Sequence, residues 1–338
     1  DIEASVKTIY CSIVCRRGKS KKFISLSSER GCIFGETKIE VKQLVLRCKG
    51  KIMIRKSAAV AALLLWSAGV QAAEGNIADS SLKANLKRAA LEISSTDVSN
   101  AREYQNSPAS ALNSDSQTVY KGVLDFILEY NNPTSQWNNR VFMNYGKTTL
   151  KPAEGKKTSS GNYDEILFTS DYSRKVWRYA DADVGPFASL GYQTEFTAND
   201  DAPKTQTVRL KSGIKLFNGA YIKDLYAAAV VEEDFTYSPD KTKTAFEVGI
   251  RPEYPLREGV TFETEGYYRD YLTYSPYQGT DFRYDLNVSA RMKVQLFDKF
   301  SFGPVVSYRR AQSREADVAG SNLMIGVSLE YSDLYSIF

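Results

Sequence analysis

The residues from Phe282 to Leu296 alternate between apolar and polar side chains without a break. Successive residues of a β-strand point to opposite faces, so this pattern predicts a strand with one apolar and one polar face. Its 15 residues exceed the usual length of a globular strand and suffice to cross a bilayer at a tilt, which takes roughly 9 to 11. Arg or Lys at the bilayer midplane costs about 2 to 4 kcal/mol, so the cationic face must point toward an enclosed polar interior.

Ten other segments alternate in the same way, and their connections are alternately short, as at Asn218-Gly219, and long, as at 147–164. Short turns on one side and longer loops on the other are typical of an outer-membrane barrel. An even strand number requires one more strand, and Leu86–Val98 is the candidate, although Leu82–Leu91 would also suit a short helix. The predicted strands are Leu86–Val98, Tyr120–Tyr130, Trp137–Gly146, Glu165–Arg174, Val184–Phe196, Thr207–Phe217, Asp224–Tyr237, Phe246–Tyr254, Val260–Leu272, Phe282–Leu296, Phe300–Gln312 and Asn322–Tyr331.

Residues 86–338 are therefore predicted to form an all-β, antiparallel transmembrane β-barrel of about 12 strands in an up-and-down meander. Aromatic residues such as Tyr120, Trp137 and Tyr254 cluster near the strand ends, where their amphipathic rings suit a membrane interface. The alternative is a soluble β-sandwich or lipocalin-like barrel. A small soluble barrel, however, turns its apolar side inward.

A secretory signal precedes the predicted barrel. Arg55 and Lys56 follow Met53, the apolar run 58–66 comes next, and small residues lead up to Ala72. The run is too short for a spanning helix, and the layout predicts a signal peptide over 53–72 that is cleaved after Ala72. Residues 73–85 would then be a periplasmic segment, and the protein would reside in the bacterial outer membrane. The alternative is a buried core helix with a chance basic flank.

Residues 1–52 show no periodicity, and the codons for residues 49–53 can contain a ribosome-binding sequence before the Met53 codon. We interpret 1–52 as upstream DNA read in frame, or as a disordered extension; a real basic cytoplasmic extension is the alternative. All four cysteines, Cys11, Cys15, Cys32 and Cys48, lie in this segment.

The charge balance of the chain also depends on this division. Of 44 basic and 40 acidic residues, 14 and 5 lie in residues 1–72, which leaves 30 and 35 in the remainder and a net charge of −5. The basic overall balance is therefore no argument for a nucleic-acid partner.

The final residue, Phe338, resembles the terminal aromatic signal of outer-membrane barrels, which implies recognition by the barrel-assembly machinery. The segments Trp137-Asn138, Tyr145-Gly146 and Thr194-Glu195-Phe196 resemble the Trp-Asn, Tyr-Gly and Thr-x-Phe motifs of an uncharacterised family of bacterial outer-membrane β-barrels. The resemblance covers about Leu91 to Phe196 and implies a porin-like architecture without an assigned activity.

Catalysis is not expected, because the sequence contains no histidine. Hydrolases of the Ser-His-Asp type need an imidazole base, and neither a phosphate-binding loop nor a metal-ligand motif is present, so we predict no catalytic residue, no cofactor and no metal. Glu263 and Glu265 lie on one face of a strand and could act as a carboxylate pair, but charged residues of a lumen wall are the simpler interpretation.

The polar faces of the strands carry the candidate functional residues, which we predict to line the lumen. These are Arg209, Lys211, Lys215, Glu232, Asp234, Glu247, Arg251, Glu253, Glu263, Glu265, Arg269, Arg283, Asp285, Arg291, Lys293 and Arg309. In one interpretation they form a narrow channel for small polar or charged solutes. In a second they fill the lumen by pairing, and the barrel has an envelope-structural or surface-binding role. A soluble periplasmic ligand-binding protein is the third hypothesis. Outer-membrane lipid is the expected partner in the first two.

Overall fold

The computed structural model describes residues 80–104, 110–112, 117–150, 158–197 and 203–338. Its strands are β1 (Ser81–Ser99), β2 (Gln117–Asn131), β3 (Ser135–Leu150), β4 (Thr158–Arg174), β5 (Trp177–Tyr179), β6 (Ala182–Thr194), β7 (Thr207–Phe217), β8 (Ile222–Asp234), β9 (Lys241–Arg257), β10 (Val260–Ser275), β11 (Phe282–Phe297), β12 (Phe300–Ser313) and β13 (Gly320–Ser336). Two short 3-10 helices, η2 (Ala101–Tyr104) and η3 (Ser110–Leu112), lie between β1 and β2. None of the helices in the described ranges is long and apolar enough to cross a membrane.

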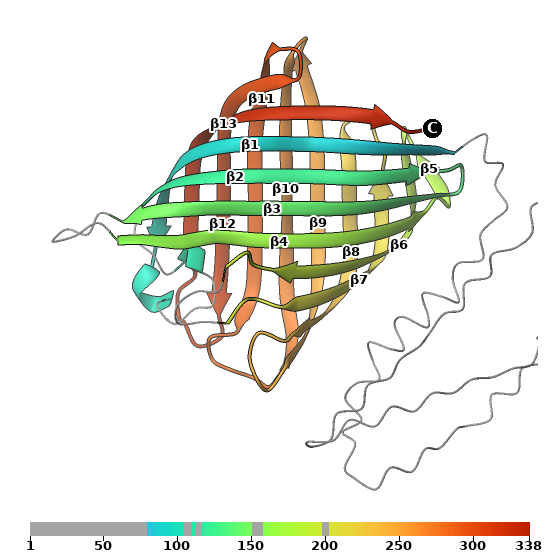
Figure 1. Cartoon of the computed structure of the whole chain (residues 1–338). Coiled ribbons are helices and arrows are strands. Elements are labelled where there is room, and N and C mark those ends of the chain that lie inside the picture. The colour runs from blue at the N-terminus through green and yellow to red at the C-terminus, as the bar shows by residue number, and fades with distance from the viewer. Residues whose placement is uncertain (1–79, 105–109, 113–116, 151–157, 198–202) are drawn as a thin grey trace, which may run out of the picture. The chain divides into compact units, whose positions relative to one another are not determined.

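The strands form a closed barrel (Figure 1). Neighbours in sequence pair antiparallel, β1 pairs with β13, and β4 pairs with β6. The three-residue β5 continues the line of β4 along β6, so the wall has 12 strands in meander order. The main-chain N–H of Leu82 donates to the carbonyl of Phe338 at 3.0 Å, which fastens the end of the chain to the start of β1. The predicted fold is confirmed.

The first strand is longer than predicted and contains a bulge. It begins at Ser81 rather than Leu86, and Lys87 has no cross-strand partner on either side. Arg88 pairs with Asp125 immediately after Leu86 pairs with Phe126, so one extra residue opposes β2 at this point. A bulge of this kind interrupts the alternation of faces, which is why the residues before Leu86 did not look like a continuation of the strand.

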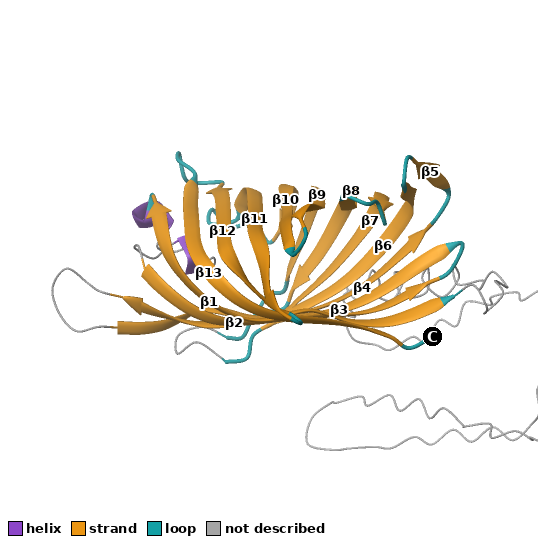
Figure 2. Cartoon of the chain, turned by 90° about the horizontal axis from the view of Figure 1, so that it is seen from above, coloured by secondary structure: helices purple, strands orange, loops and turns teal. Residues whose placement is uncertain are grey.

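The two rims of the barrel differ, as predicted. At the "turn end" the strands are joined by short connections, such as 218–221 and Asp298-Lys299. At the "loop end" the connections are longer, and Figure 2 shows η2 and η3 there, beside the ends of β1, β12 and β13. Short turns of outer-membrane barrels face the periplasm.

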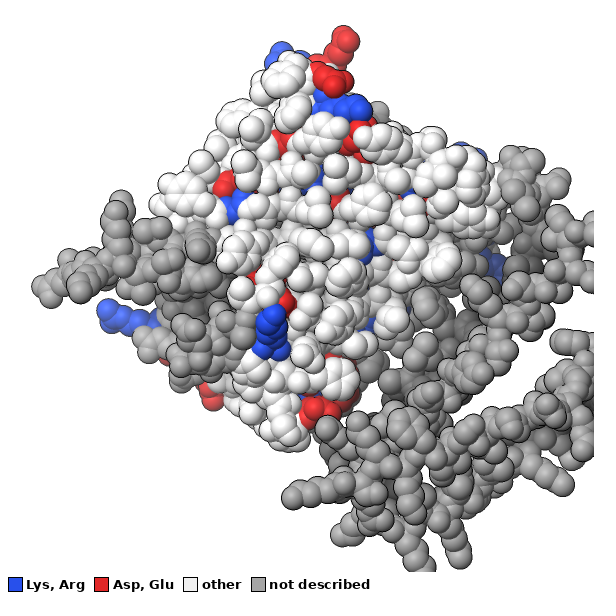
Figure 3. All heavy atoms as spheres, viewed as in Figure 1, with Lys and Arg blue, Asp and Glu red and all other residues white. Residues whose placement is uncertain are grey.

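The outer surface of the barrel is apolar. On β9, Phe246, Val248 and Ile250 are exposed, whereas Glu247 between them is fully buried. The same exposed face continues on the other strands through Leu91, Leu124, Phe168, Tyr192, Ile214, Leu225, Val231, Phe262, Phe302, Ile325, Val327 and Leu329. The side shown in Figure 3 has few charged atoms among uncharged ones on the described strands. An apolar belt of this extent is suited to lipid rather than water.

Candidate functional site: the ionic interior of the barrel

The inward faces of β7 to β10 carry the densest group of paired charges, which we name the β7–β10 ion network. Glu247 is its centre, with Oε1 at 2.5 Å from Nζ of Lys211 and Oε2 at 2.5 Å from Nη2 of Arg269. Tyr226 also donates to Oε1 of Glu247 at 2.6 Å. The side chain of Glu247 is fully buried and that of Arg269 is 5% exposed, so water has almost no access to this pair.

Glu232 forms the second half of the β7–β10 ion network. Its carboxylate lies 2.6 Å from Arg209, 2.8 Å from Lys243 and 3.7 Å from Arg269. Arg269 therefore joins Glu232 and Glu247 in one continuous arrangement. Buried charges are tolerated when they are paired and hydrogen-bonded in this way.

A second group of ion pairs lies on β10, β11 and β13. Glu263 accepts from Arg291 at 2.7 Å and lies 2.8 Å from Lys293, which in turn approaches Glu330 at 3.9 Å. Across strands, Glu263 and Arg291 are direct neighbours in the ladder between β10 and β11. Opposite charges at such positions stabilise a sheet.

One ion pair spans the interior and joins opposite walls. Arg140 of β3 makes two hydrogen bonds to Asp125 of β2, at 2.7 and 2.6 Å, and its guanidinium also lies 4.0 Å from Glu265 of β10. Five strands of the 12-strand wall separate β3 from β10 in either direction. We name Arg140 and Glu265 the cross-barrel pair, and its 4.0 Å separation shows that the interior is narrow here.

Water reaches the cross-barrel pair but hardly reaches Glu247 and Arg269 at the centre of the β7–β10 ion network. The side chains of Arg140 and Glu265 are 26% and 32% exposed. Arg309, bonded to Asp285, is 27% exposed, and Arg251 is 31% exposed. The interior thus contains tightly packed charged groups as well as charged groups that meet solvent.

The two short helices η2 and η3, which lie between β1 and β2, cover part of the loop end. Tyr104 of η2 and Leu112 of η3 are buried against Ala311 of β12. The hydroxyl of Tyr104 lies 2.8 Å from the carbonyl of Val318 and 3.1 Å from that of Ala311. The side-chain amide of Asn322, an inward residue of β13, donates to the main-chain carbonyl of Ala111 at 2.6 Å. These two helices therefore narrow the mouth above β12 and β13.

All but one of the residues predicted to line the lumen are buried or half-buried. Buried or half-buried are Arg209, Lys211, Lys215, Glu232, Asp234, Glu247, Arg251, Glu253, Glu263, Glu265, Arg269, Asp285, Arg291, Lys293 and Arg309. Arg283 is exposed, because it lies at the loop end of β11 where the ladder with β12 shifts between Phe282 and Tyr284. That any of these residues contacts a passing solute stays a prediction.

Several interior charges were missed from the sequence. Arg88, Glu92 and Lys121 form a chain of ion pairs on β1 and β2, at 3.2 and 2.8 Å. Arg88 and Glu92 lie on the polar face of the predicted strand Leu86–Val98, so inspection of that face would have found them. Asp125 and Arg140 follow the same alternation as the predicted residues, so inspection of the polar positions on β2 and β3 would have found them.

The described residues contain no group of three or more acidic side chains that could hold a metal ion. The arrangement can instead order water and charged solutes between facing acidic and basic groups. Because the outward side chains are apolar and the inward ones ionic, the wall separates lipid from a polar interior.

This is the fold of an outer-membrane β-barrel. No protein-family profile and no curated protein matches the chain. Among solved structures, an outer-membrane channel from Pseudomonas putida F1 is similar at 11% identity and a TM-score of 0.44, over 75% of this chain and 96% of that one. The channel DcaP of Acinetobacter baumannii is similar at 7% and 0.37, over 77% and 99%. The translocator domain of autotransporter NalP from Neisseria meningitidis gives 10% and 0.33, over 81% and 96%.

Proposed function

We propose that this barrel is a narrow channel for small polar or charged solutes. The observation that supports the proposal is the partial exposure of Arg140, Glu265, Arg251 and Arg309 on the inner face of the wall. Charged groups that pair only with each other in a filled interior would be buried, as Glu247 is. In this proposal the partly exposed charged side chains lie beside a water-filled path through the lumen.

In this proposal the cross-barrel pair sets the narrowest part of the path. A solute passing there meets a guanidinium on one side and a carboxylate on the other, and this field orients dipolar molecules. An apolar solute at this site would displace water from the two charged groups without replacing their hydrogen bonds, which is unfavourable. Small zwitterions and ions are the chemical class that fits.

The test is the reversal potential of single channels in planar bilayers across a salt gradient near 0.1 M, with Arg140→Gln, Glu265→Gln and, as a control, Glu258→Gln. Glu258 lies exposed in the connection between β9 and β10, so its variant makes the same chemical change outside the interior. We expect Glu265→Gln to shift the reversal potential toward anion preference and Arg140→Gln toward cation preference, with Glu258→Gln unchanged. Both shifts should shrink in 1 M salt, where the Debye length falls from about 10 Å to about 3 Å.

A barrel with a filled lumen and an envelope-structural or surface-binding role is the second candidate function. The β7–β10 ion network favours it, because the carboxylates of this network are buried in ion pairs. Wild-type protein that inserts into the bilayer but carries no current would support this candidate and contradict the channel. We also propose no enzymatic activity, since the sequence offers no histidine as a general base.

A further inference from the structure

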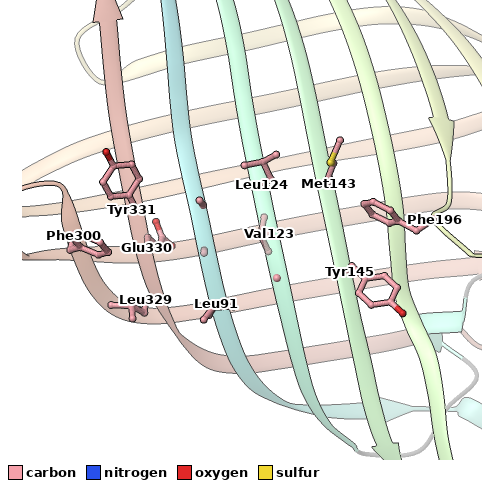
Figure 4. A pocket seen from close by; sticks show the side chains of 13 residues that line it. Leu91, Val123, Leu124, Met143, Tyr145, Phe196, Phe300, Leu329, Glu330 and Tyr331 are labelled. Carbon is pink, nitrogen blue, oxygen red and sulfur yellow. The ribbon is translucent and has the colours of Figure 1, made fainter.

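The outer wall of the barrel is hollowed by an apolar groove (Figure 4). Its volume is about 490 Å³, within the range of small-molecule sites. Phe300 and Tyr331 stand at one end, and Tyr145 and Phe196 at the other. The outward side chains that line it are Ala89, Leu91, Leu124, Met143, Tyr145, Phe196, Phe300, Leu329 and Tyr331; the buried Ala90, Val123 and Glu330 lie behind its floor.

Small residues make the floor of the groove. Gly122 pairs with Leu91 on one side and Tyr145 on the other. A Cβ atom built on Gly122 would have no heavy atom within 4 Å, so the space above this residue is open. Ala89, the residue opposite Leu124 in the ladder, continues the low floor on β1.

The end of the groove at Tyr145 and Phe196 is held in place by hydrogen bonds and a ring contact outside the sheet ladder. Phe196 follows the end of β6, and its main-chain N–H donates to the carboxylate of Asp164 at 2.5 Å. Thr197 donates to the same carboxylate at 2.9 Å. The ring of Phe196 packs edge-to-face on Tyr145, with centroids 5.7 Å apart. These contacts fix a loop aromatic over the strand surface.

The groove follows a row of direct cross-strand neighbours. Phe300 pairs with Tyr331, Tyr331 with Ala89, Ala89 with Leu124, and Leu124 with Met143. Five strands about 4.8 Å apart give this row a length of about 19 Å. One leaflet of the hydrocarbon core is about 15 Å thick, so a row that crosses the wall obliquely fits one acyl chain.

One end of the groove lies at the turn end of the barrel. Phe300 begins β12 directly after Lys299 in the connection from β11. The Lys299 ammonium lies 2.7 Å from Asp333 and its side chain is 40% exposed. A lipid phosphate at this rim would therefore meet a cation while its acyl chain extends into the groove. The short turns of such barrels face the periplasm, so the turn end meets the periplasmic leaflet.

We propose that the groove binds one acyl chain of a phospholipid whose headgroup lies at the turn end. A second copy of the chain is a poorer occupant, because the volume of the groove, about 490 Å³, is that of a small-molecule site rather than of a protein interface. The proposal depends on the membrane setting of the barrel and is independent of whether its lumen conducts.

The test uses the full-length protein in phosphatidylethanolamine vesicles that contain a small fraction of the same lipid with a photoreactive diazirine on its acyl chain. After illumination we expect Leu124 and Met143 to be labelled at least fivefold more than Val248 and Ile250 on β9. Gly122→Leu should abolish this preference by filling the groove. Ala229→Leu enlarges a small exposed residue of β8 and should leave the preference unchanged.

Equal labelling of β2–β3 and β9 in the wild-type protein would overturn the proposal, as would a preference that survives Gly122→Leu. Cross-linked dimers formed through Leu124 or Met143 would show instead that a second copy covers the groove. Glycine is a weak strand residue, so Gly122→Leu is expected to fold, and heat-modifiable migration verifies this. The wild-type labelling pattern decides the proposal even if the variant does not fold.

Discussion

At the scale of single residues, Glu247 is the side chain on which the β7–β10 ion network depends most. It is fully buried and accepts from Lys211, Arg269 and Tyr226. The alternation on β9 placed Glu247 inside from the sequence alone. Its partners could not be assigned in the same way, because the pattern gives the face of a residue but not which long side chain reaches it from two strands away.

Replacement of this carboxylate should be costly. Glu247→Gln keeps the shape but leaves Lys211 and Arg269 as poorly compensated buried cations, so we expect the free energy of unfolding to fall by about 3 to 5 kcal/mol. The measurement is urea unfolding in detergent micelles, followed by tryptophan fluorescence. The exposed Glu258→Gln should change stability by less than about 0.5 kcal/mol. Equal stability of the two variants would show that the network contributes little.

Asp181 makes a pH-dependent contribution outside the membrane-spanning segments. The main-chain N–H of Ala220 donates to its carboxylate and lowers the pKa of this group below its ordinary value. A carboxyl whose pKa is lower in the folded state stabilises the fold above its unfolded pKa, and this contribution is lost as the pH falls through the folded value. Asp181→Asn should therefore unfold more easily than wild type at pH 6 and equally at pH 2 in urea titrations. A difference independent of pH would contradict this.

At the scale of elements, the sequence predicted all 12 strands of the wall but not their full lengths or irregularities. β5 was taken as part of a connection, because three residues are too few to show a period. The bulge in β1 concealed the start of that strand, because it breaks the alternation just before Arg88. η2 and η3 carry no amphipathic repeat that could have indicated that Tyr104 and Leu112 pack into the mouth.

The bulge gives an unusual prediction about deletions. Leu86 and Arg88 already face consecutive residues of β2, Phe126 and Asp125, so removal of Lys87 should leave a regular ladder with every face unchanged. We expect the protein without Lys87 to fold and to keep its heat-modifiable migration. Deletion of Val123 from the regular strand β2 should prevent folding, because half of the strand would present its apolar side to the interior. The reverse pattern would show that the bulge is required.

At the scale of the whole molecule, the closed wall brings together residues that no local pattern connects. Arg140 and Glu265 are 125 positions apart in sequence and meet because β3 and β10 lie on opposite sides of the barrel. The sequence predicted an ionic interior, but strand number and closure were needed to find which charges face one another across it. The predicted segments 1–52 and 53–72 and the Ala72 cleavage site lie outside the described residues.

The orientation of the two faces is the central claim, and neighbouring residues on β11 test it most directly. With Cys11, Cys15, Cys32 and Cys48 replaced by serine, Val288→Cys and Ser289→Cys each carry a single thiol. In vesicles, we predict that a small water-soluble thiol reagent modifies Ser289→Cys and spares Val288→Cys, while a fluorophore on Val288→Cys is quenched by brominated lipid. Reaction at position 288 with lipid quenching at position 289 would contradict the account.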